Sequence, residues 1–178
     1  VSLHGVADVN LDKARAIGGR FEVPHVFEDD DEVFASDEID AVVLCTPSHL
    51  HEAQAIAALE AGKHVLVERP LALDPRGAER VIEAAERAGK VLMVALNNRF
   101  RADMLALRPF VHGGELGDLV LLRTAWLNRK TRTVRPTWRH QLATAGGGAL
   151  MDLGTQVLDL CLWTLGAPRI VRVAAHTH

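Results

Sequence analysis

The feature that most constrains the fold is a regular alternation of short apolar runs with helical segments over the first two-thirds of the chain. The apolar runs lie at residues 1–6, 24–27, 41–45, 64–67 and 91–96, and each is short enough to be a strand. Segments with apolar residues at helical spacing separate these runs, and the connections are brief. The alternation predicts an α/β fold, with a parallel sheet and helices on its faces.

The pattern changes after about residue 100. The elements predicted there are a helix at 101–112, a long strand at 119–127, a strongly apolar helix at 149–165 and a final strand from 170 to 175. No helix directly follows the strand at 119–127, so the strict alternation is lost. We therefore expect a domain boundary near residues 100–114, with a first domain over 1–100 and a second over 101–178.

The composition argues against two classes of partner. The net charge is −3 and the isoelectric point is about 6.3, so neither nucleic acid nor an anionic membrane is an expected partner. No apolar run approaches the roughly 20 residues that span a bilayer. The two cysteines, Cys45 and Cys161, lie in apolar runs, which is typical of a reduced, cytoplasmic protein.

Polar residues follow several of the predicted strands, at the edge where open α/β sheets bind ligands. Asp8 ends the first run, where a carboxylate would accept the two ribose hydroxyls of an adenine nucleotide and repel a 2′-phosphate. This reading favours NAD over NADP. An equal alternative is that Asp8 caps the helix that starts at Asn10.

A turn at Thr46-Pro47 follows the run at 41–45 and opens a helix. Backbone amides at this helix start could meet a phosphate or the nicotinamide ribose, although an ordinary strand-to-helix turn would look the same. His49 and His51 lie close together in this helix, but no cysteine or further histidine has suitable spacing, so we expect no metal site here.

The segment Glu68-Arg69-Pro70 delivers two charged side chains to the end of the run at 64–67. A structural ion pair is one reading, and a ligand site is the other. A second polar set, Asp152, Gln156 and Asp159, repeats on one face of the apolar helix. Such a stripe should face a cleft or be internally paired, because burial of unpaired polar groups is costly.

Taken together, these motifs resemble the Gfo/Idh/MocA family of oxidoreductases. The matching segments, in order, are Gly5 to Asn10, Thr46-Pro47 with His51, Ala61 to Pro70, Asn97 to Phe100, Gly114 to Gly117 and Gly146 to Gly154. The resemblance implies a Rossmann-type dinucleotide-binding domain and an α+β domain with a large open, mostly antiparallel sheet. It also implies hydride transfer between a nicotinamide cofactor and a sugar, cyclitol or related polyol, and a homo-oligomer formed through that sheet. The cofactor-binding residues that it implies are Asp8, Thr46, Pro47, His51, Glu68 and Asn97.

The chain departs from the family pattern at three points. The glycine-rich loop that precedes the strand at residues 1–7 is absent, and its strand would lie between those at 1–7 and 41–45. A sheet without its central strand should not be stable, and the chain begins at valine, so we expect the sequence to be a fragment. The family's Glu-Lys-Pro lysine is replaced by Arg69, which cannot release a proton near neutrality. The family's general-base histidine is replaced by Gln156, which does not titrate.

Two classes of function remain in competition. In the first, an NAD-dependent oxidoreductase uses Asp152 as its titrating group, Gln156 to position that carboxylate and Arg69 to hold the substrate oxygen. His140 is a second candidate for the proton chemistry. In the other, a cofactor- or sugar-binding regulatory protein has kept the fold and lost the chemistry. A carboxylate at Asp152 in an apolar helix favours the enzyme, and no feature supports a third reading, a polyol-binding structural subunit.

Overall fold

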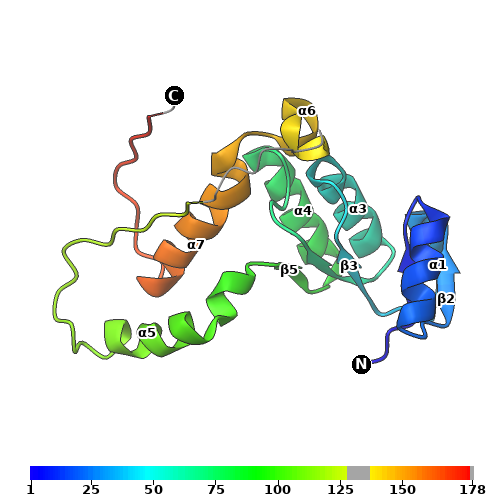
Figure 1. Ribbon diagram of the computed structural model, residues 1–178, viewed down its shortest axis with the longest axis horizontal. Helices are drawn as coiled ribbons and strands as arrows, with labels where there is room; N and C mark the ends of the chain where they lie inside the picture. Colours follow the sequence, from blue (N-terminus) through cyan, green and yellow to red (C-terminus); the bar gives the residue numbers. More distant parts are fainter. Residues whose placement is uncertain (128–136, 177–178) are drawn as a thin grey trace. The chain divides into compact units, whose positions relative to one another are not determined.

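The computed structural model describes residues 1–127 and 137–176, and it divides into two units (Figure 1). The first unit comprises residues 1–95 and 137–146. The second comprises the described residues of 96–136 and 147–178. The chain thus returns to its first unit for a short segment after residue 136, which the sequence did not indicate.

The strands of the first unit are parallel, as the alternating pattern predicted, but among the described residues they form two sheets and not the single sheet expected. Their strands are β1 (Gly5–Ala7), β2 (His25–Phe27), β3 (Ala41–Leu44), β4 (His64–Val67) and β5 (Leu92–Val94). β1 pairs with β2, and β3, β4 and β5 form the second sheet in that order. Because all pairings are parallel, the carboxyl ends of the strands within each sheet lie at one edge.

The helices of this unit are α1 (Leu11–Arg20), α2 (Asp30–Ala35), α3 (Ser48–Glu60) and α4 (Pro75–Ala88), with the short η2 (Trp138–His140) and α6 (Leu142–Ala145) from the returning segment. Side-chain caps begin α1, α2 and α4, whereas α3 begins after Pro47 without a side-chain cap. Asp74 accepts a hydrogen bond from the amide of Gly77 at 2.9 Å, and Pro75 occupies the first turn of α4. Gly89 then ends α4 in the left-handed conformation, with a φ of 63°.

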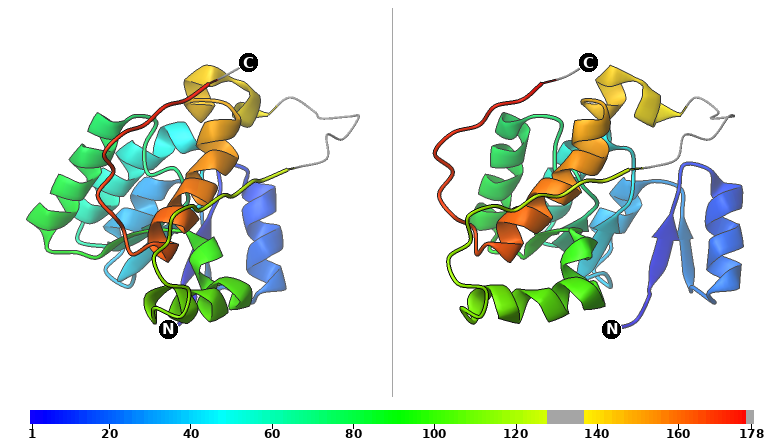
Figure 2. Two further views of the ribbon diagram at one scale, coloured as in Figure 1. Left: turned by 90° about the vertical axis from the view of Figure 1, so that its left-hand side faces the viewer. Right: turned by 60° about the vertical axis from the view of Figure 1, so that its left-hand side comes forward.

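Helices α3 and α4 pack against one face of the β3–β4–β5 sheet (Figure 2). Alternate strand residues, Val65 and Val67 among them, point to this face and are fully buried. Leu59 of α3 and Val81 of α4 complete the core at 0% exposure. On the other face of the sheet Val43 is 64% exposed. This core fixes the ends of β3 and β4, which carry the polar residues of interest.

The second unit is helical in its described part. It contains η1 (Asn97–Phe100), α5 (Ala102–His112), a π-helical turn η3 (Leu150–Gly154) and α7 (Thr155–Thr164). The single helix expected at 149–165 is therefore two consecutive elements. It is also more exposed than expected, because Leu150 and Leu158 are 66% and 56% exposed.

The strands expected at 119–127 and 170–175 do not form among the described residues. Both segments lack ladder partners, and Val120 and Val171 are 94% and 83% exposed. An apolar run becomes a strand only when another strand satisfies its amides and carbonyls, so the pattern alone was insufficient. Within the described residues, no helix has the length and apolar character required to cross a bilayer.

Candidate functional site

The carboxyl ends of β3 and β4 are held together beyond the strands themselves. The amide of Glu68 donates to the carbonyl of Leu44 at 2.9 Å, which continues the ladder by one residue. Glu68 and Arg69 are both half-buried, and the Arg69 amide donates to Glu68 Oε2 at 3.3 Å. The peptide between Arg69 and Pro70 is cis. The hydrogen bond between Glu68 and Leu44 fixes the backbone from which the strand end presents both charged residues.

His51 joins the two turns at this edge. Its side chain is 1% exposed, with Nδ1 2.7 Å from the Pro70 carbonyl oxygen and Nε2 2.8 Å from the Thr46 carbonyl oxygen. Both neighbours are backbone acceptors, so the imidazole bridges the turn after β3 and the turn after β4. His51 is thus a positioning residue for Thr46 and Pro70, and its contact with a cofactor stays a prediction.

Thr46 is also positioned through its side chain. Its hydroxyl donates to Gln54 Oε1, and Gln54 Nε2 donates to Asp30 Oδ2 at 2.7 Å. The Thr46 hydroxyl proton is therefore committed, which leaves its oxygen as an acceptor for a ligand. Sequence reasoning missed Gln54 and Asp30, because they lie 24 residues apart and neither belongs to a recognisable motif.

At this edge the carboxylate of Glu68 acts on the thiol of Cys45. Partial burial raises the pKa of the Cys45 thiol, and the nearby carboxylate of Glu68 raises it further. Cys45 directly follows β3, and Glu68 directly follows β4. The influence of Glu68 on the Cys45 pKa therefore places the Glu68 carboxylate close to the end of β3.

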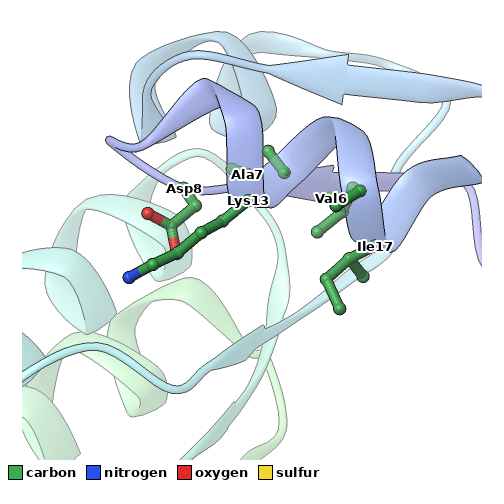
Figure 3. A pocket seen from close by; sticks show the side chains of 7 residues that line it. Val6, Ala7, Asp8, Lys13 and Ile17 are labelled. Carbon is green, nitrogen blue, oxygen red and sulfur yellow. The ribbon is translucent and has the colours of Figure 1, made fainter.

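Asp8 lies beside a pocket at the end of β1 (Figure 3). The pocket has a volume of about 290 Å³, and its lining is largely apolar, consisting of Val6, Ala7, Asp8, Lys13, Ala14, Ala16 and Ile17. Asp8 Oδ1 accepts a hydrogen bond from the Asn10 amide at 2.8 Å, but the N-cap of α1 is Asn10, whose side chain accepts from the Lys13 amide, so the reading of Asp8 as the helix cap is wrong. The Asp8 carboxylate keeps further acceptor capacity, and a ribose role is compatible with this turn. Lys13, which the sequence did not single out, extends next to Asp8.

In the second unit, the polar stripe of the late helix divides into two parts. Asn98 Nδ2 donates to Gln156 Oε1, and Arg99 Nε donates to Asp159 Oδ2 at 2.8 Å. A second bond from Arg99 Nη2 to Asp159 makes this ion pair bidentate, and it raises the pKa of Arg99. Two members of the stripe therefore anchor η1 to α7.

The remaining predicted residues of this unit are separate from that anchor. Asp152 lies in the π-helical turn and is exposed, as a proton-exchanging group can be. Asn97 opens η1, next to the anchored Asn98.

His140, the second candidate for proton chemistry, has a structural role in the returning segment of the first unit. Its Nδ1 accepts a hydrogen bond from the Thr137 amide at 3.0 Å and lies 3.1 Å from the Thr137 hydroxyl. Together these contacts form a capping box at the start of η2. The capping box thus uses Nδ1 of His140, and Nε2 takes no part in it.

Comparison with known proteins identifies the class. A family model described as "Oxidoreductase family, NAD-binding Rossmann fold" matches residues 1–96, and one described as "GFO/IDH/MocA C-terminal domain" matches residues 104–178. The chain belongs to the Gfo/Idh/MocA oxidoreductase family.

Individual relatives carry dehydrogenase names. D-glucoside 3-dehydrogenase of Escherichia coli K12 is 32% identical over 99% of this chain and 50% of the relative. The scyllo-inositol 2-dehydrogenase (NADP(+)) IolW of Bacillus subtilis is 33% identical over 84% of this chain and 40% of its own length. A levoglucosan dehydrogenase solved in complex with NADH and levoglucosan has a TM-score of 0.78 and 30% identity, covering 92% of this chain and 45% of that structure. The chain thus spans about half the length of the relatives it matches.

Proposed function

We propose that the whole protein transfers a hydride between a nicotinamide cofactor and a sugar, cyclitol or related polyol or ketone. The observation that carries the proposal is the edge at the ends of β3 and β4, where His51 fixes the turns that present Thr46, Glu68 and Arg69. Open α/β sheets bind dinucleotides at this edge. Membership of an NAD-binding oxidoreductase family supports the same conclusion.

The residues around Asp8 in the first unit suit the adenosine part of a dinucleotide. The apolar wall of the Asp8 pocket suits an adenine ring, and the Asp8 carboxylate can accept hydrogen bonds from ribose hydroxyls. A 2′-phosphate would meet the charge of Asp8, although Lys13 would partly offset it. We therefore propose NAD as the preferred cofactor, with Thr46 and Glu68 at its other end.

When bound, a nicotinamide supplies or accepts the hydride, and the chain must control the substrate and its proton. On the first unit, Arg69 would donate hydrogen bonds to a substrate oxygen and polarise it without losing its own proton. On the second unit, the Asp152 carboxylate is the group that we propose to exchange a proton. Gln156 Oε1 accepts a hydrogen bond from Asn98, and we propose that Gln156 positions the Asp152 carboxylate four residues before it.

We further propose that the segments 119–127 and 170–175 belong to an open antiparallel sheet through which copies of the protein associate. Their exposed apolar residues support this, because such surface is normally covered. Free thiols at Cys45 and Cys161 fit the cytoplasmic location that we propose. Light scattering of the full-length protein tests the association, and a monomer at micromolar concentration would contradict it.

The test of the function is NADH oxidation by the full-length protein with a panel of sugar ketones and inosose-type ketones. We expect Asp152→Asn to lower kcat by about 10²–10⁴-fold while the Kd for NADH stays unchanged. The matched control is Asp12→Asn on the exposed part of α1, for which kcat should not change. NADH binding without turnover of any polyol or ketone would refute the enzyme and favour a binding protein.

A further inference from the structure

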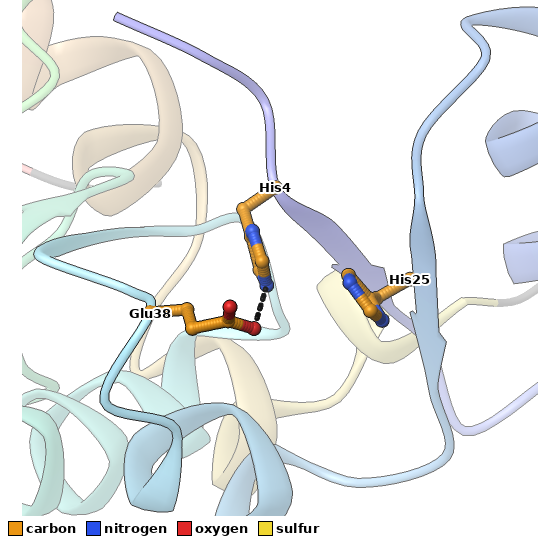
Figure 4. Close-up of side chains that lie close together, drawn as sticks. All are labelled: His4, His25 and Glu38. Atoms are coloured by element: carbon orange, nitrogen blue, oxygen red, sulfur yellow. Dashed lines mark ion pairs between the residues drawn. The ribbon is translucent and has the colours of Figure 1, made fainter.

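Three side chains gather at the amino ends of the strands of the first unit, the ends opposite to the residues discussed above (Figure 4). His4 directly precedes β1, His25 begins β2 and Glu38 lies in the connection that leads into β3. Their ligand atoms all lie within 4.8 Å of one another. His4 Nε2 is 3.3 Å from Glu38 Oε2.

Strand pairing fixes the two histidines side by side. The amide of His25 donates to the carbonyl of His4 at 3.3 Å, and the rings stack with centroids 4.5 Å apart. The next residue, Gly5, lies against the ring of Phe27, which would be only 2.4 Å from an added Cβ. Phe27 in turn stacks with His25 at 6.1 Å. The His4–His25 arrangement therefore follows from the β1–β2 register and from the glycine that admits Phe27.

The connection that carries Glu38 is anchored as well. The ammonium group of Lys63, a residue only 6% exposed, donates to the carbonyl of Ser36 at 2.6 Å. The amide of Glu38 donates to the Ser36 hydroxyl at 3.3 Å. The backbone on both sides of the cluster is thus set, while the Glu38 side chain, 72% exposed, can rotate.

Two imidazoles and one carboxylate form a ligand set that suits Zn²⁺ and similar divalent transition metals. With metal–ligand bonds of about 2.0–2.1 Å, tetrahedral ligand atoms are about 3.3 Å apart. The His4–Glu38 pair already has this separation, and rotation of the exposed His25 side chain would complete it. The segment 28–40 also carries eight carboxylates and no Lys or Arg, so its field attracts cations.

We propose that His4, His25 and Glu38 bind one Zn²⁺-type cation, with water as the fourth ligand. The ion would connect the β1–β2 sheet to the chain that enters β3. The site lies at the strand ends opposite to the proposed dinucleotide edge, and the metal takes no part in hydride transfer.

The test is a titration of the metal-free full-length protein with ZnCl₂ by calorimetry, repeated with CoCl₂ by visible absorption. We expect one saturable site whose Kd rises at least about tenfold in His25→Ala and in Glu38→Gln. Exposed His112, in the second unit, supplies the control, and His112→Ala should bind as the wild type does. Zn²⁺ should also raise the Tm of the wild type and not that of His25→Ala, because only the former binds the ion tightly.

Three results would overturn the proposal. The wild type could show no saturable site, or His25→Ala and Glu38→Gln could keep the wild-type Kd. The cobalt complex could instead show the intense near-ultraviolet charge-transfer band of a thiolate ligand, which would assign the ion to a cysteine. Because His25 and Glu38 are exposed, these variants should fold, and circular dichroism would confirm it; His4→Gln provides a further variant of the same site.

Discussion

His51 offers the sharpest test of how the proposed cofactor edge is built. The variant His51→Phe keeps a ring of similar volume and removes both hydrogen bonds, leaving the carbonyls of Thr46 and Pro70 without their partner. An unsatisfied buried polar group costs about 1–3 kcal/mol, so two of them should lower the free energy of unfolding by about 2–6 kcal/mol. That is a large share of a typical stability of about 5–15 kcal/mol.

Urea denaturation of the full-length protein measures this loss, and fluorescence titration with NADH measures the associated change in cofactor affinity. His49→Ala is the matched control, because His49 lies in the same helix, is exposed and should change stability by less than about 0.5 kcal/mol. If His51→Phe unfolds within 1 kcal/mol of the wild type by this measure and binds NADH equally well, then His51 does not organise the edge.

Three further variants probe the same unit. Arg69→Lys should retain or increase turnover if Arg69 only orients the substrate, whereas complete loss of kcat would mean that the planar guanidinium is required. Glu68→Gln removes the carboxylate that raises the pKa of Cys45, so more thiolate should form at pH 8; iodoacetamide should then label the Cys45 peptide faster, and an unchanged rate would exclude that interaction. Leu59→Ala, in the fully buried core behind β4, should cost about 2–5 kcal/mol in urea denaturation, and a loss below 1 kcal/mol would contradict its packing.

The parts of this fold that were predictable are those set by short-range chemistry. β4 has the boundaries of the apolar run at 64–67, and α4 starts and stops at Asp74, Pro75 and Gly89, which act through their own backbone and immediate neighbours. The polar residues at strand ends followed from the parallel pattern. By contrast, the segments 119–127 and 170–175 have strand-like sequences, and whether they pair depends on partners that no local pattern describes.

The contacts that the sequence could not supply join residues far apart along the chain. His51 meets the carbonyl of Pro70, 19 residues away, and Gln156 meets Asn98, 58 residues away. The spacing of Asp152, Gln156 and Asp159 predicted a single helix, whereas Asp152 lies in η3 and only Gln156 and Asp159 lie in α7. The spacing could not show that η1 pairs with the last two, because only tertiary packing brings Asn98 and Arg99 to α7.

The central claim, direct hydride transfer, is tested most directly with deuterium. The full-length protein would be mixed with NADH that carries deuterium at C4 of the nicotinamide and with the ketone that it reduces fastest. Mass spectrometry of the alcohol product should then show one deuterium, bound to carbon, when the correct face of the cofactor is labelled. A product without deuterium from either labelled form of NADH would contradict the proposed function.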